Sequence, residues 1–259
     1  MATNTYLEIH KLLSKKYPEW DFFFNYIGSK TLSNLCTSIP LGSFQTALDL
    51  GSGFGGPAIH LARASQMSIL GIERVKSLHK FASELVHLRG LDEQIQFILG
   101  DFHLIPRGDS IYNFIYALDS FLSINSTKSL TLIFDRCWRM LRPGGYFLFT
   151  FLCPKENLAS EANTYRILQR VLPILLSSYK INQNLLKSDW SVVTCSNITV
   201  SSIKYIETLF KKIIAVISSL NKEDLFEYIM DIKNKGVLKY LKTQVLDHWA
   251  FIAQKRDEY

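Results

Sequence analysis

Four glycines lie within six residues in the stretch Gly51-Ser52-Gly53-Phe54-Gly55-Gly56, directly after the apolar residues 47–50. Glycine permits the positive φ of a sharp turn and lets a ligand approach the bare backbone. Pro57 then favours the first turn of a helix, where backbone N–H groups attract a negatively charged ligand group. The stretch therefore predicts a turn that binds a nucleotide or nucleoside cofactor. Its spacing also fits the dinucleotide pattern G-x-G-x-x-G.

The carboxylate of Asp49, two residues before the first glycine, indicates which charge the ligand carries beside this turn. A carboxylate there would repel the phosphates of a dinucleotide. It would attract the cationic amino-acid end of a cofactor such as S-adenosylmethionine. Asp49 therefore favours a cationic cofactor over a dinucleotide.

A second carboxylate, Glu73, ends the apolar stretch 68–72 and stands 22 residues after Gly51. At that distance a carboxylate accepts hydrogen bonds from both hydroxyls of a ribose. We expect Glu73, with Arg74 beside it, to bind the sugar of the cofactor. The alternative role for Glu73 is to cap the next helix.

The stretch L-D-L-G-S-G-F-G-G-P, residues 48–57, resembles motif I of the class I S-adenosylmethionine-dependent methyltransferases. The stretch L-R-P-G-G, residues 141–145, is similar to a second landmark of that family. The resemblance covers about residues 44–153 by motif and 190–255 by topology. It implies S-adenosylmethionine as the cofactor, and it is closest to small-molecule N-methyltransferases of the glycine/sarcosine and phosphoethanolamine type.

The same resemblance implies further cofactor contacts. The carboxylate of Asp101 would accept a hydrogen bond from the adenine amino group, and Phe102 would pack near the ring, although Gly100-Asp101 also fits an ordinary turn. Asn25-Tyr26-Ile27-Gly28 loosely resembles the segment that covers the cofactor in such enzymes. The expected cofactor contacts are Tyr26, Asp49, Gly51, Ser52, Gly53, Gly55, Glu73, Arg74, Asp101, Phe102 and Leu118.

The candidates for contact with the methyl acceptor are chosen by predicted position alone. They are Asp119 and Tyr116 as catalytic residues, Trp20 and Trp190 as substrate contacts, and Tyr26. The carboxylate of Asp119 could pair with a cationic amine and later take a proton. Capping of the next helical segment is an equally good interpretation of Asp119.

Two further features bear on the acceptor. In several small-amine methyltransferases a histidine follows this aspartate, but Ser123 stands where it would align, which leaves the acceptor's identity open. His248 alternates within an apolar strand and is interpreted as structural. The sequence has no H-E-x-x-H motif or clustered His/Cys/Asp set, so we expect no metal, which weakly favours a nitrogen acceptor.

Several other functions remain open. An O- or C-methyltransferase acting on a natural product or lipid precursor is the main alternative. An NAD-linked oxidoreductase, an RNA methyltransferase, and a protein that binds the cofactor without catalysis are less favoured.

The elements that must position these residues alternate along the chain. Short apolar stretches at 47–50, 68–72, 95–99, 112–118 and 146–152 are separated by helical patterns. This alternation predicts an α/β fold with a Rossmann-like, doubly wound sheet of seven strands. We expect the sixth strand at 190–193, helices over 201–219 and 222–242, and an antiparallel last strand at 245–254.

Four segments are expected. These are an N-terminal helical lid (1–44), an S-adenosylmethionine-binding core (45–153), a helical cap insertion (154–189), and the C-terminal part of the core sheet with its helices (190–259).

Composition adds the cellular setting. A net charge of +6 permits contact with nucleic acid, but no run of Lys or Arg stands out, so a small-molecule partner is favoured. Four dispersed cysteines suit a reducing compartment, and the sequence has neither a signal-like N-terminus nor a membrane-spanning run. We expect a cytoplasmic protein that could form oligomers.

Overall fold

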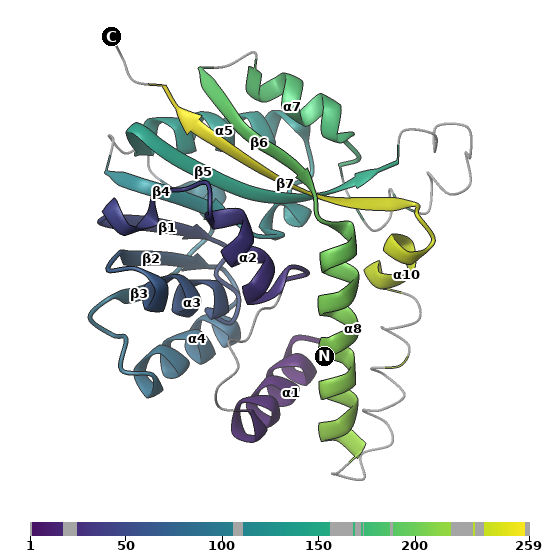
Figure 1. Cartoon of the computed structure of the whole chain (residues 1–259). Coiled ribbons are helices and arrows are strands. Elements are labelled where there is room, and N and C mark those ends of the chain that lie inside the picture. Colours follow the sequence, from purple (N-terminus) through teal and green to yellow (C-terminus); the bar gives the residue numbers. More distant parts are fainter. Residues whose placement is uncertain are drawn as a thin grey trace.

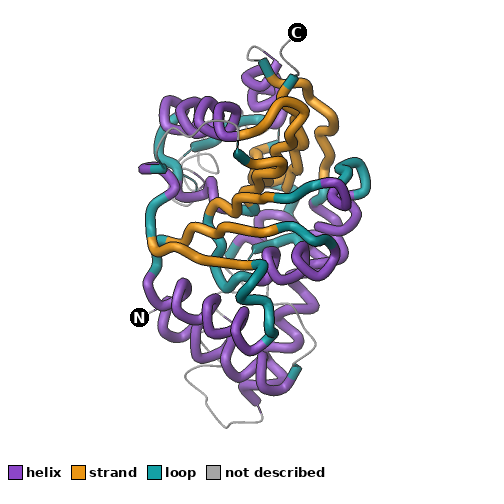
Figure 2. Tube along the Cα trace, turned by 90° about the vertical axis from the view of Figure 1, so that its left-hand side faces the viewer, coloured by secondary structure: helices purple, strands orange, loops and turns teal. Residues whose placement is uncertain are grey.

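The computed structural model describes residues 2–17, 25–105, 111–155, 168, 172, 174–186, 189–218, 230 and 236–256. Its centre is a seven-stranded sheet with the order β3-β2-β1-β4-β5-β7-β6 (Figures 1 and 2). The strands are β1 (Thr46–Leu50), β2 (Ser68–Glu73), β3 (Ile95–Leu99), β4 (Tyr112–Ala117), β5 (Leu141–Pro154), β6 (Trp190–Asn197) and β7 (Leu246–Lys255). The described helices are α1 (Ala2–Lys16), α2 (Gly28–Cys36), α3 (Gly56–Ala64), α4 (Lys76–Leu88), α5 (Thr127–Met140), α7 (Ser178–Leu186), α8 (Thr199–Ser218) and α10 (Val237–Lys242).

The direction of the strands confirms the predicted fold class. β1 pairs in parallel with β2 and β4, and β5 pairs in parallel with β4. β7 runs antiparallel to both β5 and β6. The predicted antiparallel last strand is therefore present, and it separates β5 from β6. β6 begins at the predicted Trp190 and extends to Asn197.

Two apolar cores cover the two faces of the sheet. Residues of α1, α2, α3, α4, α8 and α10 pack on one face, and residues of α5 and α7 pack on the other. Side chains alternate along a strand, so Ala47 joins the first core and Leu48 the second. Asp49 and its register partner Tyr116 share the face of Ala47.

The N-terminal helices pack against the rest of the chain on this first face. α1 contacts α4 and α8, and Figure 1 shows α1 beside the long α8. α2 contacts α3 and α8. The segment 1–44 thus contains the helices α1 and α2, and its action as a lid remains a prediction.

Half of the predicted cap, 154–189, falls outside the described residues, and so does most of the predicted helix 222–242. Within them, α7 lies against β6, and α10 occupies the end of the second stretch. Among the described helices, none is long and apolar enough to cross a membrane.

Candidate active site

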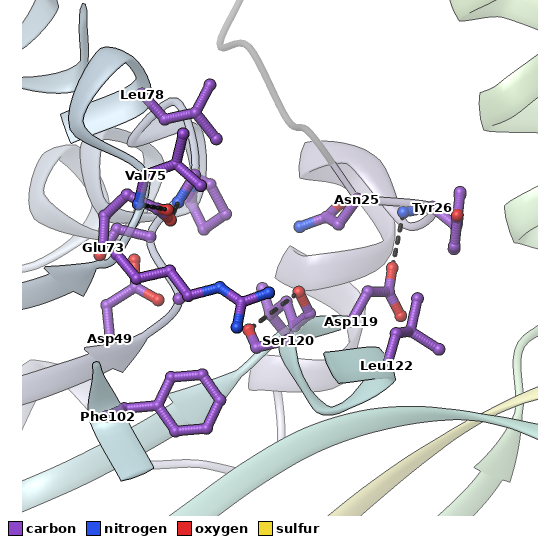
Figure 3. A pocket seen from close by; sticks show the side chains of 16 residues that line it. Asn25, Tyr26, Asp49, Glu73, Val75, Leu78, Phe102, Asp119, Ser120 and Leu122 are labelled. Atoms are coloured by element: carbon purple, nitrogen blue, oxygen red, sulfur yellow. Dashed lines mark hydrogen bonds between the residues drawn. The ribbon is translucent and has the colours of Figure 1, made fainter. Parts of the chain in front are cut away.

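A cavity of about 260 Å³ opens at the carboxyl ends of β1, β2 and β4. Open α/β sheets place their ligands at this edge, where the strand order reverses between β1 and β4. Figure 3 shows Glu73 and Val75 at one end of the cavity and Tyr26 and Asp119 at the other. The lining residues are Asn25, Tyr26, Asp49, Gly51, Ser52, Gly53, Pro57, Glu73, Arg74, Val75, Leu78, Phe102, Leu118, Asp119, Ser120 and Leu122.

The glycine turn lets the backbone lie close to the cavity. Gly51 has φ +83°, and a Cβ atom on it would lie 2.7 Å from the hydroxyl oxygen of Ser120. A larger residue would therefore be strained and would collide with the cavity wall. Gly55, also at positive φ, precedes α3, and Pro57 stands in the first turn of that helix as predicted.

Asp49 carries an unsatisfied carboxylate oxygen at the cavity wall. Asp49 is 2% exposed, and its Oδ2 has no hydrogen-bond partner among the described residues. The hydroxyls of Ser52 and Tyr116 are also buried without such a partner. Burial raises the pKa of Asp49 to about 8; the hydroxyls of Tyr116 and Ser52 act against this rise, and the Glu73 carboxylate adds to it.

Unpaired buried polar atoms are costly, and at a cavity wall they indicate groups that a ligand satisfies. Two of these atoms belong to residues of the cavity lining, the carboxylate oxygen of Asp49 and the hydroxyl of Ser52. An acceptor and a hydroxyl suit an ammonium or hydroxyl ligand better than a phosphate, so this part of the lining fits a cofactor with a cationic end near Asp49.

Glu73 organises the other end of the cavity. Its Oε2 accepts a hydrogen bond from Gly53 N–H at 2.9 Å, and its Oε1 accepts one from Val75 N–H at 2.8 Å. A carboxylate can accept about four hydrogen bonds, so each oxygen retains capacity for a ligand hydroxyl. Glu73 thus ties the glycine turn to β2 and also faces the cavity.

Asp119 lies at the opposite end with a strained backbone and a crowded carboxylate. Its φ of 60° is in the left-handed region, which non-glycine residues seldom adopt and which clusters at functional sites. His248 Nε2 and Thr150 Oγ1 bond to Oδ1, and Tyr26 N–H donates to Oδ2.

Burial alone would raise the pKa of Asp119, but the charge and hydrogen bond of His248, with hydrogen bonds from Thr150 and Tyr26, hold the pKa below its usual value. An aspartate with a lowered pKa is a good partner for a cation and a poor proton acceptor.

Most of the predicted site residues meet at this cavity. Its lining includes Tyr26, Asp49, Gly51, Ser52, Gly53, Glu73, Arg74, Phe102, Leu118 and Asp119. Gly55 supports the turn from below, where Phe97 and Ala82 pack close to it. Asp101 does not line the cavity, and its Oδ1 accepts a hydrogen bond from His103 N–H at 2.9 Å.

Two proposed acceptor contacts, Tyr116 and Trp190, do not line the cavity. Tyr116 is fully buried beneath the cavity beside Asp49, so it could act only through that residue. Trp190 is 1% exposed, packs on Phe147 at 5.6 Å in the core on the other face, and lines a second cavity there. We therefore withdraw Trp190 from the acceptor contacts. Trp20 lies outside the described residues.

The sequence interpretation missed two residues that bond to Asp119. His248 was interpreted as structural, and Thr150 received no role. Thr150 interrupts the apolar run F-L-F-T-F-L at 147–152, and it is fully buried. A buried hydroxyl inside such a run needs a partner, which is the signal that could have drawn attention to it.

Among the described residues, no group of three His, Cys, Asp or Glu side chains could hold a metal ion.

Comparison with known proteins identifies a domain within the chain. Residues 47–145 match the family model described as "Methyltransferase domain". Over 171 residues the chain is 26% identical to the phosphoethanolamine N-methyltransferase of Plasmodium falciparum. This match covers 63% of each protein. Over 113 residues it is 30% identical to a sterol 24-C-methyltransferase of Gibberella zeae, covering 44% of this chain and 29% of that protein.

The fold comparison extends further along the chain. A crystal structure of a putative sarcosine dimethylglycine methyltransferase from Galdieria sulphuraria superposes with a TM-score of 0.70 at 21% identity, covering 88% of this chain and 84% of that one. The two sequence matches, in contrast, span 29% and 63% of those relatives' own length. Residues 47–145 thus form a methyltransferase domain, and the chain as a whole shares the fold of the methyltransferase structure on which it superposes.

Proposed function

We propose that this protein transfers a methyl group from S-adenosylmethionine to an amine nitrogen of a small molecule. One observation carries the proposal: a single cavity has a buried carboxylate with an open oxygen, a second carboxylate at the end of β2, and a third, Asp119, at its far end. Three carboxylates facing one cavity suit a cationic donor and a cationic acceptor.

The residues at the donor end have separate tasks. Asp49 and Ser52 would bind the cationic amino-acid part, Glu73 the ribose hydroxyls, and Phe102 would pack near the adenine. The cofactor supplies a methyl group that is already activated on a positively charged sulfur. The chain's own contribution is mainly to align acceptor and donor, an effect that can lower a barrier by roughly 7–11 kcal/mol.

The acceptor end is limited by the hydrogen bonds that Asp119 already makes. A carboxylate has about four acceptor positions, and His248, Thr150 and Tyr26 occupy three of them. The remaining one, on Oδ2, suits one N–H of a protonated amine. Asp119 would hold that amine near the donor, while its lowered pKa makes it a weak base. We therefore assign Asp119 to binding the amine. The amine would lose one proton to solvent before methyl transfer, because only the neutral nitrogen has a lone pair, and a remaining N–H could still donate to Asp119.

A C-methyltransferase is the second candidate, because a sterol 24-C-methyltransferase is among the relatives with a significant match. A sterol needs a long apolar surface. Among the described residues, the acceptor end instead has Asn25, Tyr26, Asp119 and Ser120 beside the two leucines Leu118 and Leu122. This polarity favours the amine.

A panel assay tests the proposal. The protein is incubated with methyl-labelled S-adenosylmethionine and either phosphoethanolamine, sarcosine, a sterol or a metabolite extract, and labelled products are identified by mass. We expect a label on nitrogen, and no label on the sterol. A label only on carbon or oxygen would overturn the amine assignment, and donor binding without any labelled product would indicate a binding protein.

The cellular setting is a lesser part of the proposal. All four cysteines are free thiols, three of them buried, which supports a reducing and thus cytoplasmic compartment.

A further inference from the structure

His248 connects Asp119 to the C-terminal part of the chain. Its Nε2 lies 2.8 Å from Asp119 Oδ1, although the two residues are 129 positions apart in the sequence. The imidazole is fully buried, and the Asp119 side chain is 6% exposed. On the same carboxylate, Thr150 donates to Oδ1 at 2.7 Å and Tyr26 N–H donates to Oδ2 at 2.7 Å. β7, β5 and the loop before α2 therefore meet at one carboxylate.

The partners of the imidazole define which nitrogen carries a proton. An ionised carboxylate can only accept, so Nε2 of His248 must be the donor. Nδ1 lies 2.7 Å from the Ser202 hydroxyl, which is also 3.1 Å from the carbonyl oxygen of Ile198. A hydroxyl can donate to Nδ1 or accept from it, so the network fits either protonation state of the ring. In both states Nε2–H points at Asp119.

The backbone of His248 is held equally firmly. Its N–H donates to Thr199 Oγ1 at 2.9 Å, and its carbonyl accepts from Ile198 N–H at 2.8 Å. The Tyr26 ring and the imidazole form a T-shaped contact, with the ring centroids 6.1 Å apart. The imidazole thus supports both the Asp119 carboxylate and the loop residues 25–27.

A simple contribution to stability does not explain this arrangement. Burying a charged or polar pair removes water from both partners, so such pairs often add little net stability. The left-handed backbone of Asp119 adds strain rather than relieving it. A strained, fully bonded group at a cavity wall is what a site needs when one orientation of a carboxylate must be kept.

We infer that His248 is a positioning residue for the acceptor: it holds Asp119 so that Oδ2 anchors the Tyr26 loop and keeps its one open acceptor position directed at the cavity. This inference rests on the proposed function for its effect on turnover. Its effect on the loop is independent of that function.

Two substitutions of equal polarity test the inference. The amide of His248→Gln extends to about the position of Nε2 and can still donate to Asp119. The amide of His248→Asn is shorter and reaches only about the position of Nδ1, near Ser202. Phe251→Leu is the control, because Phe251 is fully buried on β7 but belongs to the opposite core.

The kinetic readout separates positioning from folding. We expect His248→Asn to raise the KM for the acceptor at least about tenfold, with the affinity for the donor changed by less than about threefold. We expect His248→Gln and Phe251→Leu to keep the acceptor KM within about threefold of the wild type. Equal effects of the Asn and Gln variants, or an equal effect of Phe251→Leu, would overturn the inference.

Hydrogen exchange of the Tyr26 amide gives a readout that needs no turnover. In the free protein, His248→Asn should speed this exchange at least about tenfold, whereas His248→Gln should preserve its protection. Equal protection in the two variants would overturn the inference. A clear exchange difference in a protein that methylates no amine would reject the proposed function and leave the positioning role intact. Should either His248 variant fail to fold, Ser202→Ala replaces it: faster Tyr26 exchange is expected, and unchanged exchange would overturn the inference.

Discussion

At the scale of single residues, the buried carboxylate of Asp49 suits ligand binding but lowers the stability of the free protein. Burial raises its pKa to about 8, with a further rise from Glu73 and a partial offset from the Tyr116 and Ser52 hydroxyls. An aspartate with a folded pKa above its unfolded value destabilises the fold progressively as pH rises from about 4 to 8. A cationic ligand removes that penalty, because it favours the ionised form.

Donor binding should therefore depend on pH. Affinity for S-adenosylmethionine is expected to rise between about pH 6 and 8, with uptake of the donor releasing protons into the buffer. Titration calorimetry in two buffers of different ionisation enthalpy measures that release. Asp49→Asn should abolish this proton release and weaken donor binding. It should also stabilise the free protein by roughly 1–3 kcal/mol. Binding that is independent of pH and buffer in the wild type would contradict the role of Asp49.

Glu73 has two tasks, and its substitution should reveal both. Glu73→Ala removes the ribose acceptor and also the hydrogen bonds to Gly53 and Val75. We expect at least about tenfold weaker donor binding, or about 1.4 kcal/mol, by calorimetry. Glu84→Ala is the matched control, because Glu84 is half-exposed on α4 and pairs with Lys80. Unchanged donor affinity in a folded Glu73→Ala protein would remove Glu73 from the cofactor site.

At the scale of elements, the loop before α2 and the end of β4 are joined by Asp119. Asp119→Asn keeps one carbonyl oxygen, which His248 and Thr150 would hold at the position of Oδ1. The new amide would then face Tyr26 N–H, so that two donors oppose each other. We expect faster hydrogen exchange at Tyr26 and at least about a hundredfold loss of turnover, with less than about tenfold loss of donor affinity. Slow exchange and normal turnover in this variant would show that the loop is held by other contacts.

The elements themselves were largely predictable from the sequence, because their signals are local. β3 has its predicted bounds, and the apolar stretches of β1, β2, β4 and β5 lie within their observed strands or exceed them by a single residue. Asp49, Gly51 and Glu73 were found because each has a fixed offset from such a strand. The partners of Asp119 could not be found in this way. Thr150 on β5 and His248 on β7 come together only because these two strands pair in the fold.

Trp190 shows a second limit of local patterns. β6 reads Trp-Ser-Val-Val-Thr-Cys, and its pairing with β7 shifts register between Val192 and Thr194. A one-residue shift moves side chains to the other face of a sheet. The alternation in the sequence therefore did not decide which face Trp190 occupies, and the structure places it away from the cavity.

At the scale of the whole molecule, ligand binding should stabilise the folded chain selectively. A ligand at a hundred times its dissociation constant adds about 2.7 kcal/mol to the free energy of unfolding. For a chain of 259 residues this corresponds to a rise in Tm of roughly 5–10 °C. We expect this rise with S-adenosylhomocysteine and none with NAD in a thermal melt. The reverse preference would indicate a dinucleotide enzyme.

The central claim is that the cavity at the carboxyl ends of β1, β2 and β4 binds the methyl donor, and a crystal structure with S-adenosylhomocysteine tests it most directly. The ligand should span that cavity with both ribose hydroxyls bonded to Glu73, its amino group near Asp49, and its sulfur toward the end formed by Tyr26 and Asp119. Density for the ligand anywhere else, such as the second cavity beside Trp190, or a ribose that Glu73 does not contact, would contradict the account.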